Sequence, residues 1–132
     1  MKQTRQLQRS NNTTDTPERL REDVLSFWIK RRVAAEYGLN PRDLLGGGSR
    51  GRRRCEARGR AAYLLNAVCG LSGEATGRAL DQDRRSIIRT VARIEANRDD
   101  PVLDAVIEGL SQEIGPLLAA LDGWAQLARA RA

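Results

Sequence analysis

Residues 71–95 read LSGEATGRALDQDRRSIIRTVARIE, and this stretch decides the fold. Ser72 is placed to cap a short helix over residues 73–80, and Asp81-Gln82-Asp83 makes a turn after it. A second helix follows over about 84–97, and we expect it to direct four apolar side chains inward: Ile87, Ile88, Val91 and Ile94. Two helices joined by a tight turn form a helix-turn-helix, whose second helix begins in the major groove of DNA.

Several residues around the turn at 81–83 can be explained either by helix structure or by contact with DNA. Asp83 is first the N-cap of the second helix and only then a contact to DNA. Arg84 and Arg85 oppose the helix dipole at a helix start, which favours a binding function for them and for the neighbouring Ser86. Arg89 and Arg93 are expected on a side of the same helix that faces solvent or a phosphate group. Within the first helix, Gly77 indicates close packing.

Capping signals upstream predict three more helices. Thr16-Pro17-Glu18 combines a hydroxyl cap, a proline and an acid, so a helix is expected from there to about Tyr37, with Gly38 as its stop. Asn40-Pro41 repeats the signal for a short helix through Leu45, and a third helix spans about 55–69. The buried stripe of the first helix is expected to consist of Leu20, Val24, Phe27, Trp28 and either Val33 or Ala34.

A heptad repeat marks the C-terminal segment. Gly115-Pro116 interrupts it, so we expect a kink or two shorter helices. Packing on the chain's own core is favoured up to about Leu110. Beyond Pro116, packing in cis and contact with a partner are equally favoured, the partner being a second copy, RNA polymerase or a second activator subunit. The residues expected to meet such a partner are Leu117, Leu121 and Trp124. The apolar residues recur at steps of four and three: Leu103, Ile107, Leu110, Ile114, Leu117, Leu121, Trp124 and Ala128.

Arginine is concentrated in residues 49–60, SRGRRRCEARGR, which hold six arginines and one acid. Most of the chain's formal net charge of +6 therefore lies in twelve residues. We expect residues 46–54, which begin with three glycines, to form a flexible loop. Like charges in a short loop repel one another unless an anion compensates them, which favours a phosphate backbone as the partner. The arginines expected to contact phosphates are Arg52, Arg53, Arg54 and Arg60.

Composition argues against several other classes of protein. The chain has no histidine, and its two cysteines lack neighbouring ligands, so we expect no metal site, no cofactor and no enzyme activity. Aromatic residues make up only 4%, which disfavours a single-strand binder that stacks bases on rings. No apolar run approaches a membrane span, and the arginines lack the adjoining apolar face that a membrane surface requires. We expect a cytoplasmic, nucleoid-associated protein with reduced thiols.

The order of these signals resembles the C-terminal DNA-binding domain of the bacterial replication initiator DnaA. The matching pieces are VAAEYGLNPRDLL (33–45), a basic loop, EARGRAAYLL (56–65) and residues 71–95. The resemblance covers somewhat over half of the chain and implies an all-α domain that binds double-stranded DNA. A free-standing domain of this kind is similar to the DNA-binding parts of phage-like regulators and of activators of gene transfer agents.

The resemblance also implies contacts for particular residues. Arg50 corresponds to the loop arginine that enters the minor groove, and Arg58 to an arginine that contacts a base in the major groove. Residues 83–86 correspond to the start of the recognition helix. Gln82 replaces the family's signature arginine and Arg84 its histidine, so a different binding site is implied, with arginine favouring guanine. No G-x-x-x-x-G-K-[ST] loop occurs, and we expect no nucleotide hydrolysis.

Together these patterns predict a helix-turn-helix bundle of five to seven helices with a C-terminal helical extension. We expect a disordered arm over residues 1–15, a DNA-binding domain over 16–98 and an amphipathic extension over 99–132. The expected function is sequence-specific binding of double-stranded DNA by a transcription regulator, most simply an activator. The alternative is a replication regulator that acts by contact with an initiator or polymerase subunit.

Overall fold

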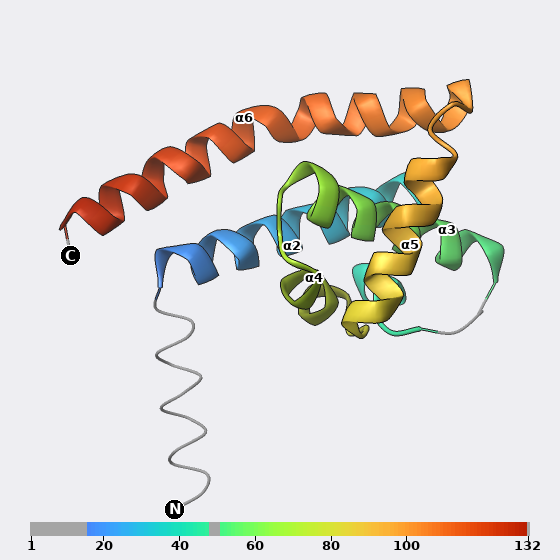
Figure 1. The fold of residues 1–132 in the computed structure, drawn as a ribbon, viewed down its shortest axis with the longest axis horizontal. Coiled ribbons are helices and arrows are strands. Elements are labelled where there is room, and N and C mark those ends of the chain that lie inside the picture. The colour runs from blue at the N-terminus through green and yellow to red at the C-terminus, as the bar shows by residue number, and fades with distance from the viewer. Residues whose placement is uncertain (1–15, 48–50, 132) are drawn as a thin grey trace, which may run out of the picture.

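The computed structural model describes residues 16–47 and 51–131, and the arm predicted over residues 1–15 and Arg50 lie outside them. The described residues form helices and contain no strand, so the predicted all-α class is confirmed (Figure 1). The elements are α2 (Pro17–Tyr37), the 3-10 helix η1 (Pro41–Leu44), α3 (Arg52–Tyr63), the π-helical segment η2 (Leu64–Val68), α4 (Gly73–Leu80), α5 (Arg84–Ala96) and α6 (Pro101–Arg131).

Helix α2 has the predicted ends, but only the later part of the predicted stripe is buried. The Thr16 hydroxyl accepts a hydrogen bond from the Arg19 amide at 3.1 Å, and Gly38 ends the helix at a φ of 65°. The expected positions Leu20, Val24 and Phe27 are 39%, 43% and 62% exposed. The helix has two neighbouring apolar stripes, one at residues 20, 24 and 27 and the other at 25, 29 and 33. Packing against the other helices buries the second stripe. Leu25 and Ile29 are buried instead, while the predicted Val33 and Ala34 are buried and the predicted Trp28 packs partly against the core.

Helix α6 is one continuous helix, so the predicted division into two shorter helices at Gly115-Pro116 is wrong. Figure 1 shows it curving gently along α2. Gly115 and Pro116 both lie on the exposed side, where the carbonyl group left without a proline N–H partner can bond to water. Ile114 and Leu117, on either side of Gly115-Pro116, pack on the core and hold both halves of the helix against it.

Helices α2 and α6 run antiparallel, joined by apolar contacts and ion pairs. Ile107, Leu110, Ile114 and Ala125 are buried, and Leu117 and Leu121 pack against the same core. Ion pairs flank these contacts, with Arg32 to Glu113 at 2.8 Å, Arg21 to Asp122 at 2.7 Å and Arg129 to Glu18. Intrachain packing, one of the two alternatives for the segment beyond Pro116, therefore accounts for Leu117 and Leu121. Trp124 remains 42% exposed.

Arg98 fixes the sharp connection between α5 and α6. Its guanidinium donates hydrogen bonds to Asp104 at 2.8 Å, to Glu108 at 3.0 Å and to the Tyr63 hydroxyl at 2.7 Å. The bond to Asp104 is the main cause that raises the pKa of Arg98. Because Tyr63 belongs to α3, this one side chain anchors the beginning of α6 to the centre of the domain.

Helices α4 and α5 form the predicted helix-turn-helix. The Ser72 hydroxyl accepts from the Ala75 amide at 3.0 Å, and Asp81 makes the turn in the left-handed conformation with a φ of 53°. Gly77 packs so closely against the turn that an added Cβ would lie 2.4 Å from the Gln82 carbonyl oxygen. The close packing expected at Gly77 is therefore confirmed.

Replacing two helical glycines by alanine should have opposite effects. Gly77→Ala should lower the free energy of unfolding by about 2 kcal/mol or more, because a backbone carbonyl must move to admit the methyl group. The control Gly109→Ala in α6, where no atom lies within 4 Å of the added Cβ, should raise it by about 0.5–1 kcal/mol through helix propensity. Urea unfolding followed by circular dichroism measures both. Equal stability of the two variants would contradict the packing at Gly77.

Candidate nucleic-acid interface

The N-terminal turn of α5 presents cations to solvent. Asp83 caps the helix by accepting a hydrogen bond from the Ser86 amide at 2.8 Å, as predicted, and this bond is the main cause that lowers the pKa of Asp83. Arg84 and Arg85 are exposed, and Ser86 is half-buried. The stem of Arg84 passes over Gly73, 3.1 Å from the place a Cβ would occupy there. The cap therefore ionises readily and fixes the helix start, while both guanidinium groups remain at the surface.

An exposed row continues from this turn along α5. Residues 85, 88, 89 and 92 are all exposed and follow the spacing of one helix face. Ile88 lies in this row and is 50% exposed, so the prediction that it faces inward is wrong. The inner face is filled by the other three predicted residues: Ile87, which is fully buried, Val91, which packs on the core, and Ile94, which lies over Gly59.

Helix α3 begins three residues earlier than predicted. Gly51, at a φ of 88°, turns the chain into the helix, so Arg52, Arg53 and Arg54 lie in its first turn and not in a loop. Arg52 and Arg53 are exposed, although Arg53 donates a hydrogen bond to the Tyr37 carbonyl group. Arg54 lies 3.6 Å from Asp43. No acid stands in this first turn to offset the unfavourable interaction of three cations with the helix dipole.

Arg58 is 6% exposed and supports the segment before the loop. It donates a hydrogen bond to the Gly46 carbonyl at 3.0 Å and another to the Arg54 carbonyl at 3.3 Å. Gln82, in the turn of the helix-turn-helix, donates to the same Gly46 carbonyl at 2.9 Å. A contact between Arg58 and a base, as the resemblance implies, would require the side chain to leave these acceptors.

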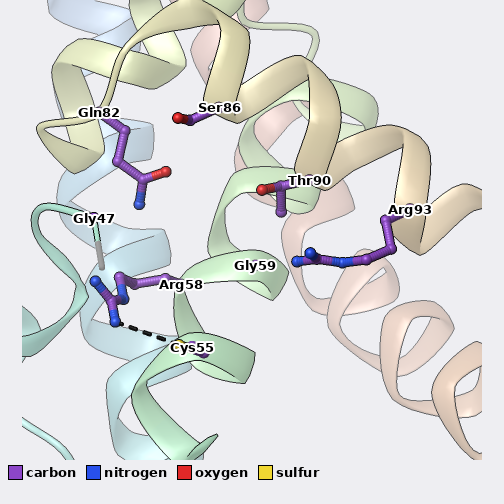
Figure 2. A pocket seen from close by; sticks show the side chains of 8 residues that line it. All are labelled: Gly47, Cys55, Arg58, Gly59, Gln82, Ser86, Thr90 and Arg93. Atoms are coloured by element: carbon purple, nitrogen blue, oxygen red, sulfur yellow. Dashed lines mark hydrogen bonds between the residues drawn. The ribbon is translucent and has the colours of Figure 1, made fainter. Parts of the chain in front are cut away.

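A hollow of about 250 Å³ lies between α3, α5 and the segment at Gly47. Figure 2 shows Ser86, Thr90 and Arg93 reaching it from α5, opposite Arg58 and Cys55 of α3. No carboxylate lines the hollow, whereas two guanidinium groups, two hydroxyl groups and one amide do, and these groups suit an anion. The complete lining is Gly47, Cys55, Arg58, Gly59, Gln82, Ser86, Thr90 and Arg93.

Thr90 and the supporting function of Gln82 were not predicted, whereas Arg93 was expected on the side of the helix that faces solvent or a phosphate group. Ser86, Thr90 and Arg93 follow the i, i+4, i+7 spacing of one helix face, so the sequence held a signal for them. The hydrogen bond from Gln82 to Gly46 spans 36 residues and had no such local signal. Arg60, which was predicted, is half-buried, with its guanidinium 5.4 Å from the centre of the Tyr37 ring.

Ion pairing divides the molecule into two electrostatic regions. Several arginines on α2 and α6 are paired with acids, as in Arg21 with Asp122, Arg32 with Glu113 and Arg129 with Glu18. Within the described residues, several arginines of α3 and α5 form no ion pair, and their positive charge is left to attract external anions. These arginines are Arg52, Arg84, Arg85, Arg89 and Arg93.

Comparisons of the chain with family models, with curated proteins and with solved structures each find no match. Over residues 16–47 and 51–131, no helix combines the length and apolar character that a membrane crossing requires. In the same part of the chain, no three acidic or cysteine side chains gather in a group that could hold a metal ion.

The two cysteines, neither of which forms a disulfide, should differ sharply in reactivity. Cys55 is exposed, whereas burial raises the pKa of the Cys69 thiol to about 11. At pH 8 only about one Cys69 thiol in a thousand would be ionised, and it would still be shielded from solvent. Labelling with an aromatic disulfide reagent should modify one thiol per native chain, and Cys55→Ser should remove that reaction while Cys69→Ser preserves it. Two rapidly labelled thiols in the native protein would contradict the burial of Cys69.

Proposed function

We propose that this protein binds double-stranded DNA at a specific sequence, with α5 as its recognition helix. The observation that carries the proposal is the pair Arg84 and Arg85, exposed and without an ion pair at the start of the second helix of a helix-turn-helix. Cations at a helix N-terminus oppose the dipole, and an external acceptor removes that cost. Guanine O6 and N7 in the major groove are the acceptors that arginine binds most specifically.

Other cations of this face would position the duplex without reading its sequence. Arg52, Arg53 and Arg54 mark the start of α3, and Arg93 reaches the hollow beside Ser86 and Thr90. A phosphate group entering this hollow would meet hydroxyl and guanidinium donors and no carboxylate. Arg58 and Gln82 would act indirectly, since their bonds to Gly46 hold the adjoining segment beside α5.

The DnaA-like order of motifs supports transcription regulation as the biological outcome, with activation of phage-like or gene-transfer-agent genes as the specific form. The chain would then supply DNA recognition without nucleotide hydrolysis. A replication regulator that acts by protein contact is the second candidate. It is favoured by the exposed Trp124 and Leu127 near the end of α6, which are 42% and 61% exposed.

Charge-matched variants separate base reading from phosphate contact. The wild-type protein is first used to select duplexes from a random pool, and the affinity for a selected and a random duplex is then measured across salt concentrations. Arg84→Ala should weaken the selected duplex by about 1–3 kcal/mol and relax specificity. Arg52→Ala should weaken both duplexes alike and lower the salt slope by about one, because one phosphate contact is lost.

Arg131→Ala is the matched control, since it removes one exposed cation at the end of α6, far from α5 in Figure 1. It should leave both affinities and the salt slope unchanged. The proposal is wrong if the wild-type protein enriches no sequence from the pool. It is also wrong if Arg131→Ala loses as much affinity for the selected duplex as Arg84→Ala does.

A further inference from the structure

One large apolar side chain, Ile88, lies exposed beside two arginines on the outer face of α5. Ile88 is 50% exposed, with Arg85 one turn before it and Arg89 directly after it. Ala92, one turn further on, is exposed and small, so no long side chain screens Ile88 from that direction. A single exposed isoleucine is common on protein surfaces and by itself indicates no binding site. Ile88 differs because it lies beside Arg85 and Arg89, which form no ion pair in the described structure.

We propose that Ile88 recognises the 5-methyl group of a thymine in the major groove and thereby determines part of the binding sequence. This inference rests on the proposed DNA-binding function and assigns a base-reading contact to a residue that the sequence pattern had placed in the core. A ligand that binds this face of α5 must offer an apolar group to Ile88 and hydrogen-bond acceptors or negative charge to Arg85 and Arg89. The major groove offers this combination, because the thymine methyl lies beside base-edge acceptors and the phosphate backbone.

An apolar protein surface fits this location poorly. Covering Ile88 with such a surface would also cover Arg85 and Arg89, which form no ion pair and have only the capping Asp83 nearby. Desolvating these two cations costs more free energy than burying one isoleucine contributes. DNA covers the same residues while compensating both charges. The preferred sequence should therefore place a thymine next to the guanine read from the start of α5.

Deoxyuridine tests the contact, because it differs from thymidine only by the absent methyl group. The probe is the duplex selected by the wild-type protein, resynthesised with each thymine replaced in turn by uracil. One replacement should weaken wild-type binding about three- to fivefold, the loss expected for one methyl group no longer buried. Ile88→Ala should bind the thymine and uracil duplexes equally, and Ile88→Val should retain part of the difference.

Leu127→Ala is the matched control, because it truncates another exposed aliphatic side chain at the opposite end of the molecule. It should keep the full difference between thymine and uracil. Thermal unfolding should show that Ile88→Ala remains folded, since the side chain is half exposed. If a sequence is selected and Ile88→Ala weakens the thymine and uracil duplexes by the same factor, the contact is refuted and DNA binding stands. If no sequence is selected, the proposed function fails and the inference with it.

Discussion

Three hydrogen bonds converge on the peptide groups of one residue, Gly46, and the candidate interface depends on them. Its amide donates to the Leu80 carbonyl at the end of α4, and its carbonyl accepts from Arg58 of α3 and Gln82 of the turn. Arg58 is buried, so it makes these bonds away from competing water. The segment at Gly46 is therefore tied both to α3 and to the helix-turn-helix.

The distribution of ion pairs also determines where positive charge is left at the surface. Helix α6 brings acids to α2, where Arg21 and Arg32 form ion pairs with them. The outer face of α5 has no such neighbour, and only Asp83, already engaged as a cap, lies at its start. Within the described residues, arginines without an ion pair are thus concentrated on α3 and α5, where their charges add to a local field.

Features governed by local chemistry could be predicted from the sequence. The bounds of α4 and α5 follow from Ser72, Asp81 and Asp83, because capping residues act on amides two or three positions away. Features that depend on a choice among packing partners could not. Ile88 belongs to an apolar run with more members than the inner face of α5 accepts, and only contact with α3 decides which is left outside.

The same limit explains the other errors and the gaps in the site. Leu20, Val24 and Phe27 form a plausible stripe that the assembled domain does not use. Pro116 breaks a helix in isolation, but the long contact with α2 holds α6 together across it. Gln82 is ordinary as a turn residue and becomes a support only through a carbonyl group 36 positions away.

Helix α6 extends well beyond the region formed by α3 and α5. Its 31 residues extend about 46 Å at the usual helical rise, and in Figure 1 it leaves the α3–α5 region and continues beside the beginning of α2. The ion pair between Glu18 and Arg129 joins the two helices there. The far end of the α2–α6 pair is therefore separated from α5. A molecule bound at that end and a molecule bound at α5 would not compete for the same space.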